Sequence, residues 1–159
     1  MKRLLAVPAA LLGIAAVAVL TIAVAMRWQI APALRVIRTL NRTVTNPALM
    51  RTAGTAASET AVVVHVGRGS GRTYRTPVHI DRFGDRIVIA LPYGRDVDWV
   101  RNITTHGGAV IESGGHKAIT ANPAIVAANE VSAWLPQRQR RAIALFGVRE
   151  CLCLDVVSE

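Results

Sequence analysis

Residues 61–91 read AVVVHVGRGSGRTYRTPVHIDRFGDRIVIAL, and this stretch decides the fold class. It begins with a short, β-branched run that is typical of a buried strand. Residues 75–82 alternate between polar and apolar side chains and predict a second strand, and residues 86–91 predict a third. Because glycine supplies a turn conformation, Phe83-Gly84-Asp85 is expected to join the last two strands as a hairpin.

The residues downstream of this stretch continue the pattern of short elements. In chain order they predict a helix over 98–105, strands over 109–112 and 116–121, a helix over 130–146 interrupted at Pro136, and a strand over 151–157. The long helix offers four core candidates, Val131, Leu135, Ile143 and Phe146. Six short strands without strand–helix–strand alternation predict a mainly β (α+β) fold, a small antiparallel barrel with peripheral helices.

Length and composition limit the class of protein. With 159 residues, of which 52% are hydrophobic and 18% charged, the chain has the size of one domain with its own core. A disordered chain and a multidomain enzyme are thereby excluded. In a strand, Cys151 and Cys153 would lie about 6.6 Å apart with diverging Cβ bonds, which excludes a disulfide scaffold. They are interpreted as reduced, buried small hydrophobes, consistent with a cytosol-facing domain.

The chain is strongly basic, with a formal net charge of +9, and lysine occurs only at Lys2 and Lys117. This balance indicates either an anionic partner (phosphate, a membrane surface or nucleic acid) or a solvated basic surface. Nucleic-acid binding is not expected, because 3 Trp, 2 Tyr and 2 Phe provide few platforms for stacking bases. No metal site is expected, since Asp96, Asp98 and His106 lack ligand spacing.

The amino terminus predicts a membrane segment. Residues 4–26 contain no charge and, at about 1.5 Å per residue, are long enough for a helix that spans a bilayer of about 30 Å. We interpret them as an uncleaved anchor; a cleaved signal peptide with Ala23-Val24-Ala25 at its cleavage site is the alternative. Cations follow the span at Arg27, Arg35, Arg38 and Arg42, so the domain is expected on the cytoplasmic side of the cell membrane.

A second helix is predicted directly after the span. Leu34, Ile37, Leu40 and Val44 recur at helical spacing, with arginines on other faces. This pattern fits a helix that lies on an anionic leaflet, and it equally fits an amphipathic helix packed on the domain. Asn46-Pro47 is expected to end the helix.

The loop Gly67-Arg68-Gly69-Ser70-Gly71-Arg72 is the first candidate binding site. Its glycines allow backbone N–H groups to converge on an anion, and its arginines add bidentate donors. The loop lacks the Gly-Lys-Ser/Thr of a P-loop, and it is followed by a strand instead of the helix of a dinucleotide-binding motif. An ordinary hairpin turn is the alternative.

The run G-R-x-S-G-R-x-x-R-T-P at 67–77 resembles the signature of the deazaflavin (coenzyme F420)-dependent nitroreductase and quinone reductase family. Leu91-Pro92-Tyr93-Gly94, followed by Asp98-Trp99-Val100-Arg101-Asn102, is similar to that family's post-strand loop and Trp-x-x-Asn helix. The resemblance covers about residues 60–121. It implies a split β-barrel of the flavin-binding type and coenzyme F420 as the cofactor.

The resemblance also implies which residues bind the cofactor. Arg68, Ser70, Arg72 and Arg75 would hold its acidic phosphate and glutamate tail, while Pro77, Val78 and Leu91-Pro92 would provide an apolar slot for its ring. The alternatives are structural roles: packing for Pro77 and Trp99, a helix-end cap for Asn102 and a solvated charge for Arg75. The full predicted set is Arg68, Gly69, Ser70, Arg72, Tyr74, Arg75, Thr76, Pro77, Val78, His79, Ala90, Leu91, Pro92, Tyr93, Asp98, Trp99, Val100, Arg101 and Asn102.

The implied function is a membrane-anchored oxidoreductase that transfers a hydride between reduced F420 and an acceptor such as a quinone or nitro compound. Because the cofactor carries the hydride, no catalytic acid, base or nucleophile is assigned. No tyrosine follows Tyr93 to line an acceptor pocket, so nitro-drug activation does not carry over. The alternatives are a noncatalytic module for an anionic ligand or lipid, and an FMN-binding split-barrel enzyme.

The domains are then an anchor at 1–28, an amphipathic helix and linker at 29–58, and a split-barrel cofactor-binding domain at 59–159.

Overall fold

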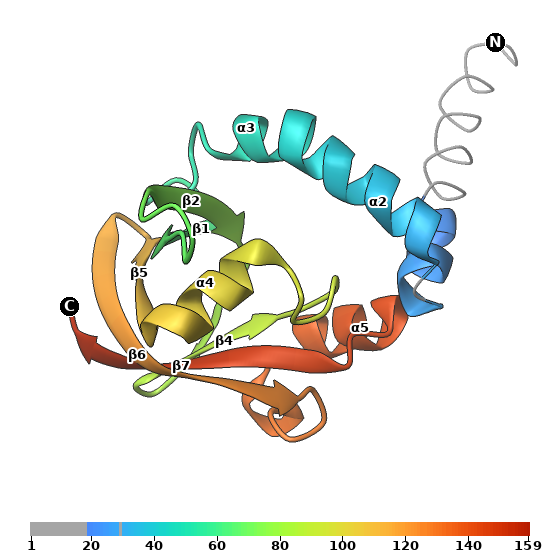
Figure 1. Ribbon diagram of the computed structural model, residues 1–159. Helices are drawn as coiled ribbons and strands as arrows, with labels where there is room; N and C mark the ends of the chain where they lie inside the picture. Colours follow the sequence, from blue (N-terminus) through green and yellow to red (C-terminus); the bar gives the residue numbers. More distant parts are fainter. Residues whose placement is uncertain (1–18, 29) are drawn as a thin grey trace, which may run out of the picture.

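The computed structural model describes residues 19–28 and 30–159 (Figure 1). Most of the span predicted over 4–26 therefore lies outside the described residues, and the anchor stays a prediction. Within the described ranges, no helix is both long enough and apolar enough to cross a membrane. Residues 19–27 of the predicted segment are helical.

Seven antiparallel strands form one sheet in the order β2-β1-β5-β6-β7-β4-β3. Their bounds are β1 Ala61–Val66, β2 Thr73–Val78, β3 Asp81–Phe83, β4 Arg86–Ala90, β5 Gly108–Ser113, β6 His116–Ala127 and β7 Glu150–Ser158. The two edge strands, β2 and β3, are separated in the chain only by His79 and Ile80. The sheet must therefore curl until its edges approach each other, although they do not pair. The result is a mainly β half-barrel, as the sequence predicted in outline.

The long strand β6 makes this curl possible. Its first half pairs with β5 and its second half with β7, and the register shifts between Ile119 and Thr120 and again between Ala121 and Ala124. Asn122 has a positive φ of 52° at the second shift. Such bulges bend a strand and increase its twist, which is how one strand can serve two parts of a curved sheet.

Two strand and helix predictions are wrong in detail. The single strand expected over 75–82 is two strands, because the chain leaves β1 after Val78 and joins β4 on the opposite edge from Asp81. The helix expected over 130–146 is a 3-10 turn, η2 (Ser132–Trp134), followed by α5 (Gln137–Phe146), because Pro136 starts a new helix at its N-cap. The strand at 61–66, the hairpin at 83–85 and α4 (Asp98–His106) are confirmed.

The second predicted helix continues past its expected end. α2 (Ala31–Leu40), the π-helical turn η1 (Asn41–Thr45) and α3 (Asn46–Leu49) follow without a break, and we call residues 31–49 the wall helix. The Asn46 N–H donates to the Asn41 carbonyl, five residues back. This wider turn directly precedes Pro47, where an ordinary α-helix would clash with the proline ring, so the proline does not end the helix.

The core consists of two clusters on the two sides of the central strands. The first contains Ile87, Ile89, Ile103, Leu152 and Leu154, all 2% exposed or less. The second contains the sequence-predicted Val131 and Leu135 together with both cysteines. Cys151 and Cys153 are free and buried, as expected, and burial raises the pKa of Cys151 to about 11. Ile143 and Phe146, also predicted for the core, are only half-buried.

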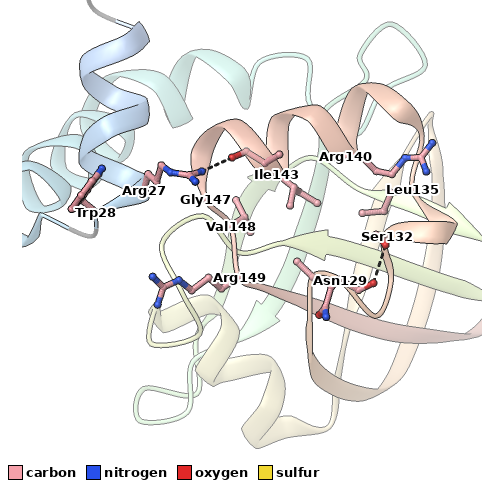
Figure 2. Close-up of a pocket in the computed structure, with 12 residues that line it drawn as sticks. Arg27, Trp28, Asn129, Ser132, Leu135, Arg140, Ile143, Gly147, Val148 and Arg149 are labelled. Carbon is pink, nitrogen blue, oxygen red and sulfur yellow. Dashed lines mark hydrogen bonds between the residues drawn. The ribbon is translucent and has the colours of Figure 1, made fainter.

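The N-terminal segment docks on the barrel through α5 (Figure 2). Arg27 Nη1 donates to the Ala144 carbonyl over 2.9 Å, which places a cation at the C-terminal end of a helix, where it is stabilising. Gly147 lies directly beneath, and a Cβ there would meet Arg27 Cα at 3.0 Å. From this point the wall helix runs back across the barrel face that carries β2 (Figure 1).

Candidate functional site

The Gly-rich loop at 67–72 is closed by its own backbone. Gly67 N–H donates to the Arg72 carbonyl and Gly71 N–H to the Gly67 carbonyl, both over 2.8 Å. A Cβ on Gly67 would come within 2.5 Å of Ser70 Oγ and 2.6 Å of the Tyr74 ring. Glycine is therefore required at position 67 for the close approach of loop and strand.

Asn102 is the central residue of a buried network that holds this loop. Its Oδ1 accepts from the Arg68 N–H (3.1 Å) and from Arg68 Nη1 (2.9 Å), and its side chain lies 3.1 Å from His65. Arg68 Nη2 also pairs with Asp98 at 2.9 Å. Asn102 is only 5% exposed and lies in the middle of α4, so the alternative of a helix-end cap is wrong.

The same network determines the tautomer of His65. Because Asn102 Oδ1 accepts from Arg68, its amide Nδ2 must donate, and His65 Nδ1 must accept. The His65 proton then resides on Nε2, which donates to Thr76 Oγ1 over 3.1 Å. Burial lowers the pKa of His65, in agreement with a neutral ring. No role was predicted for His65 from the sequence, because a histidine within a β-branched strand does not by itself indicate a function.

Two pockets adjoin this network and share a boundary. One, which we call the slot, has a volume of about 430 Å³ and is mainly apolar. The other, the groove, has a volume of about 970 Å³ and contains the Gly-rich loop. Both are lined by Arg38, Arg42, Asn46, Thr76, Val97 and Trp99. Slot and groove therefore form one cleft with an apolar end and a polar end.

Fifteen of the nineteen predicted site residues line this cleft. The slot contains Thr76, Pro77, Val78, His79, Ala90, Pro92, Tyr93 and Trp99, and the groove contains Arg68, Gly69, Ser70, Tyr74, Arg75, Thr76, Asp98, Trp99 and Asn102. The fold thus brings together residues from three segments that are distant in the chain: β2, the end of β4, and α4. The half-buried Ile143 and Phe146 of α5 also line the slot, and Ile143 packs against the edge of the second core cluster as well.

Four predicted site residues lie elsewhere. Leu91 and Val100 are 3% and 1% exposed and belong to the first core cluster, because the strand end and the helix turn these side chains inward. Arg101 lies on the solvent side of α4 and pairs with Asp96 at 2.8 Å. Arg72 is exposed and lines neither pocket, since the loop directs it outward.

The charges on the β-sheet side of the cleft are mostly neutralised by ion pairs. Arg75 binds both carboxylate oxygens of Glu112, at 3.3 and 2.5 Å, and this contact lowers the pKa of Glu112. Arg68 is paired with Asp98. At the other end of β2, His79 Nε2 lies 3.7 Å from Asp81, whose pKa burial raises. The paired arginines shape the groove, and they contribute less net charge to it than the sequence suggested.

The wall helix forms the opposite side of the cleft, and sequence analysis did not assign it to the site. Arg38 Nη2 donates to the Tyr93 carbonyl over 3.0 Å, and its guanidinium lies 5.7 Å from the Tyr93 ring centroid. Asn41 Nδ2 donates to Tyr93 Oη over 2.6 Å. Burial of this phenol raises the pKa of Tyr93. The sequence indicated this contact only through one of the two interpretations of the helix, in which it is amphipathic and packs on the domain.

Among the described residues, Arg38 and Arg42 are cleft arginines without an ion pair, and Arg38 is engaged with Tyr93. Arg42 lines both slot and groove, and among the ion pairs of the described residues it has none. In the same described ranges, no group of three or more His, Cys, Asp or Glu side chains could hold a metal ion. The arrangement offers an apolar surface for a flat ring and polar or cationic contacts for an anionic extension.

A further pocket, of about 710 Å³, lies on the other side of α5 (Figure 2). Arg27 and Trp28 line it together with residues of η2 and α5. It contains none of the predicted site residues, although Ile143 and Val148 line both this pocket and the slot.

The fold is a mainly β half-barrel, and its cleft has an apolar end and a polar end. No protein-family model and no curated protein matches the sequence. Solved structures that are similar include the F420-H2 dependent reductase FDR-A, at 11% identity and a TM-score of 0.46 over 61% of this chain and 94% of that one.

An F420 reductase is similar at 11% identity and a TM-score of 0.47, over 62% of this chain and 86% of that one. A candidate 5-nitroimidazole antibiotic resistance protein from Bacteroides thetaiotaomicron is similar at 11% identity and a TM-score of 0.47, over 65% and 75% of the two chains. At these values the matches do not assign the chain to a family.

Proposed function

We propose that this protein is an oxidoreductase that uses coenzyme F420 and transfers a hydride between the reduced cofactor and an acceptor such as a quinone or nitro compound. One observation carries the proposal. The two sequence motifs that resemble the F420-dependent family, at 67–77 and 91–102, supply most of the β-sheet side of a single cleft with an apolar and a polar end.

The residues present fit a deazaflavin cofactor. The slot, at about 430 Å³, has the size of a small-molecule site and is bounded by the apolar side chains of Pro77, Val78, Trp99 and Phe146. These groups exclude water and orient a flat ring. When bound, the deazaflavin supplies the hydride chemistry itself.

The groove suits the acidic tail of the cofactor. Arg42 supplies a charge without an ion-pair partner, and Ser70 and Tyr74 offer hydroxyl groups that lie 3.1 Å apart. Arg68, whose side chain is 36% exposed, keeps donor capacity while Asp98 holds it in place. In this assignment Arg72, Leu91, Val100 and Arg101 support the site from outside the cleft or take no part in it.

The membrane belongs to the proposal as well. The uncharged run 4–26 would anchor the chain with its domain on the cytoplasmic side, and the first residues after it enter the wall helix. A quinone dissolved in the bilayer would then be the acceptor nearest to the cleft. Two results would replace this function. In one, the protein is an enzyme that uses FMN; in the other, it is a noncatalytic module that binds an anion.

The test is a parallel titration of purified full-length protein, in detergent, with F420, FMN and inorganic phosphate. F420 is expected to bind most tightly, and addition of a water-soluble quinone to the complex with reduced F420 should restore the absorbance of the oxidised cofactor. Tighter binding of FMN than of F420 would show that FMN is the cofactor. Binding of phosphate without binding of either ring would indicate the noncatalytic module.

A variant that fills the slot tests whether the ring binds there, and a control variant on β7 reports any general effect of an added tryptophan. Val78→Trp should fill the slot and abolish ring binding, whereas Val157→Trp, on the exposed end of β7, should not. If both variants bind F420 like the parent, the ring is not bound in the slot.

A further inference from the structure

The wall helix turns its polar residues toward the protein. Six of them line the cleft, beside the apolar Pro47 and Leu49: Arg38, Thr39, Asn41, Arg42, Thr45 and Asn46. Only Leu34 of this helix is buried, at 5% exposure. A helix packed on a globular domain ordinarily does the reverse, burying its apolar stripe and exposing its polar face.

The opposite face of the same helix is aliphatic and exposed. Val36, Leu40 and Val44 are 67%, 56% and 59% exposed. They are four residues apart, so they form one continuous stripe along the helix. Leaving three neighbouring aliphatic side chains in water is unfavourable, which indicates that something apolar covers this stripe.

The surroundings of the stripe indicate what that partner is. The preceding helical segment also exposes Val19, Leu20, Ile22 and Val24, by 40% to 62%, and Trp28 beside it is 75% exposed. No acidic residue occurs before Glu59, while Arg27, Arg35, Arg38, Arg42 and Arg51 all lie in this region. An exposed aliphatic surface in a region whose charged side chains are all arginines matches the acyl boundary and the anionic headgroups of a lipid bilayer.

We propose that the stripe of Val36, Leu40 and Val44 lies in the interfacial region of an anionic bilayer. The wall helix then contacts lipid with its apolar face and forms the cleft with its polar face. The cleft is separated from the acyl chains by one helix, about 10 Å across. A lipid-soluble acceptor can reach the cleft around the edge of that helix; this last consequence rests on the proposed function.

A second copy of the chain is a poorer partner for the stripe. A symmetric dimer through this face would place the same patch of both chains together. The segment from 19 to 58, apart from the undescribed residue 29, carries arginines and no acidic residue, so such a dimer would bring two surfaces of like charge together. Like charges opposed across an interface are unfavourable.

The test measures where the stripe lies and does not involve the cofactor, so it can fail while the proposed function holds, and the reverse. Full-length protein carrying Val36→Cys, Leu40→Cys or Val44→Cys is labelled with an environment-sensitive fluorophore and reconstituted into vesicles of phosphatidylcholine and phosphatidylglycerol. Quenching by nitroxide-bearing lipids and by aqueous iodide is then recorded for each position.

Val157→Cys is the matched control, because Val157 has the same residue type and the same 59% exposure as Val44 but lies on β7. The buried Cys151 and Cys153 should not label, which the unsubstituted protein checks.

At the three stripe positions we expect lipid quenching severalfold stronger, and iodide quenching severalfold weaker, than at position 157. Equal quenching at all four positions, or quenching of the stripe by iodide alone, would overturn the proposal. Protection from both quenchers that grows with the protein-to-lipid ratio would show that a second copy covers the stripe instead.

Discussion

The two sides of the cleft are built in different ways. On the β-sheet side, Asn102, His65 and Arg68 are joined by hydrogen bonds that engage the oxygen and nitrogen of the buried amide and both nitrogens of the imidazole. On the other side, the wall helix contacts the motif residues mainly through Tyr93, by way of Arg38 and Asn41. The first construction rests on buried hydrogen bonds, whereas the second rests on contacts to Tyr93 and on the buried Leu34, so we expect the helix side to open more readily. The β-sheet side is therefore suited to recognition and the helix side to closure.

Removing the amide of Asn102 should have the largest effect. Asn102→Ala leaves His65 Nδ1 and the Arg68 N–H without their partner, and we expect the free energy of unfolding to fall by about 1–3 kcal/mol for each of these two groups. Urea denaturation of the full-length protein measures this loss. Asn102→Asp keeps the acceptor for Arg68 but cannot donate to neutral His65, so it should lose part of the stability and regain some at acidic pH. An alanine variant as stable as the parent would mean that the β-sheet side is not rigid.

The next largest effect concerns the helix side. Arg42→Gln should weaken F420 binding about tenfold or more, because a charge-assisted contact contributes about 1.5–3 kcal/mol, without changing the free energy of unfolding. Arg141→Gln is the matched control, since Arg141 is exposed on α5 and lines neither slot nor groove. Fluorescence titration provides the affinities. An equal loss in both variants would mean that only net charge matters.

Below neutral pH, a pH dependence should arise at His65, on the β-sheet side. The pKa of His65 is lowered from 6.5 by burial, so between that lowered value and 6.5 the unfolded chain binds more protons than the folded one. Stability from this group is complete above pH 6.5 and should be lost as the pH falls below it. The urea midpoint of the parent, measured against pH, should decline in this window more than that of His65→Gln, whose amide does not titrate. Identical pH profiles would exclude His65 as the cause.

The smallest effect is expected at Tyr93. Tyr93→Phe removes the hydroxyl that accepts from Asn41 but keeps the ring beneath Arg38, so the free energy of unfolding should change by only about 0.5–1.5 kcal/mol. Hydrogen exchange should nevertheless become faster in residues 31–49 and stay unchanged in 61–78. Faster exchange in both segments would show that the two sides of the cleft open together, which contradicts the contrast drawn between them.

Local sequence patterns predicted the elements that are stabilised by their own neighbours. The β-branched run of β1, the Gly84 turn and the periodicity of α4 each suffice to indicate the local structure. The motif residues at 67–77 and 91–102 were also recognised as one candidate site, because both resemble motifs of the same family and occur in the same order. Leu91 and Val100 were included in error, since a contiguous motif does not reveal which of its side chains turn toward the core.

The sequence by itself thus determined a mainly β domain, the positions of most strands and the loop and helix that form the β-sheet side of the cleft. Only the tertiary structure decided that 75–82 divides between the two edges of the sheet, because strand pairing depends on segments distant in the chain. It also decided that the wall helix faces the cleft with its arginines. Helical periodicity shows that a helix has two faces, but which face is turned inward depends on the partner, and that partner, Tyr93, lies over fifty residues away.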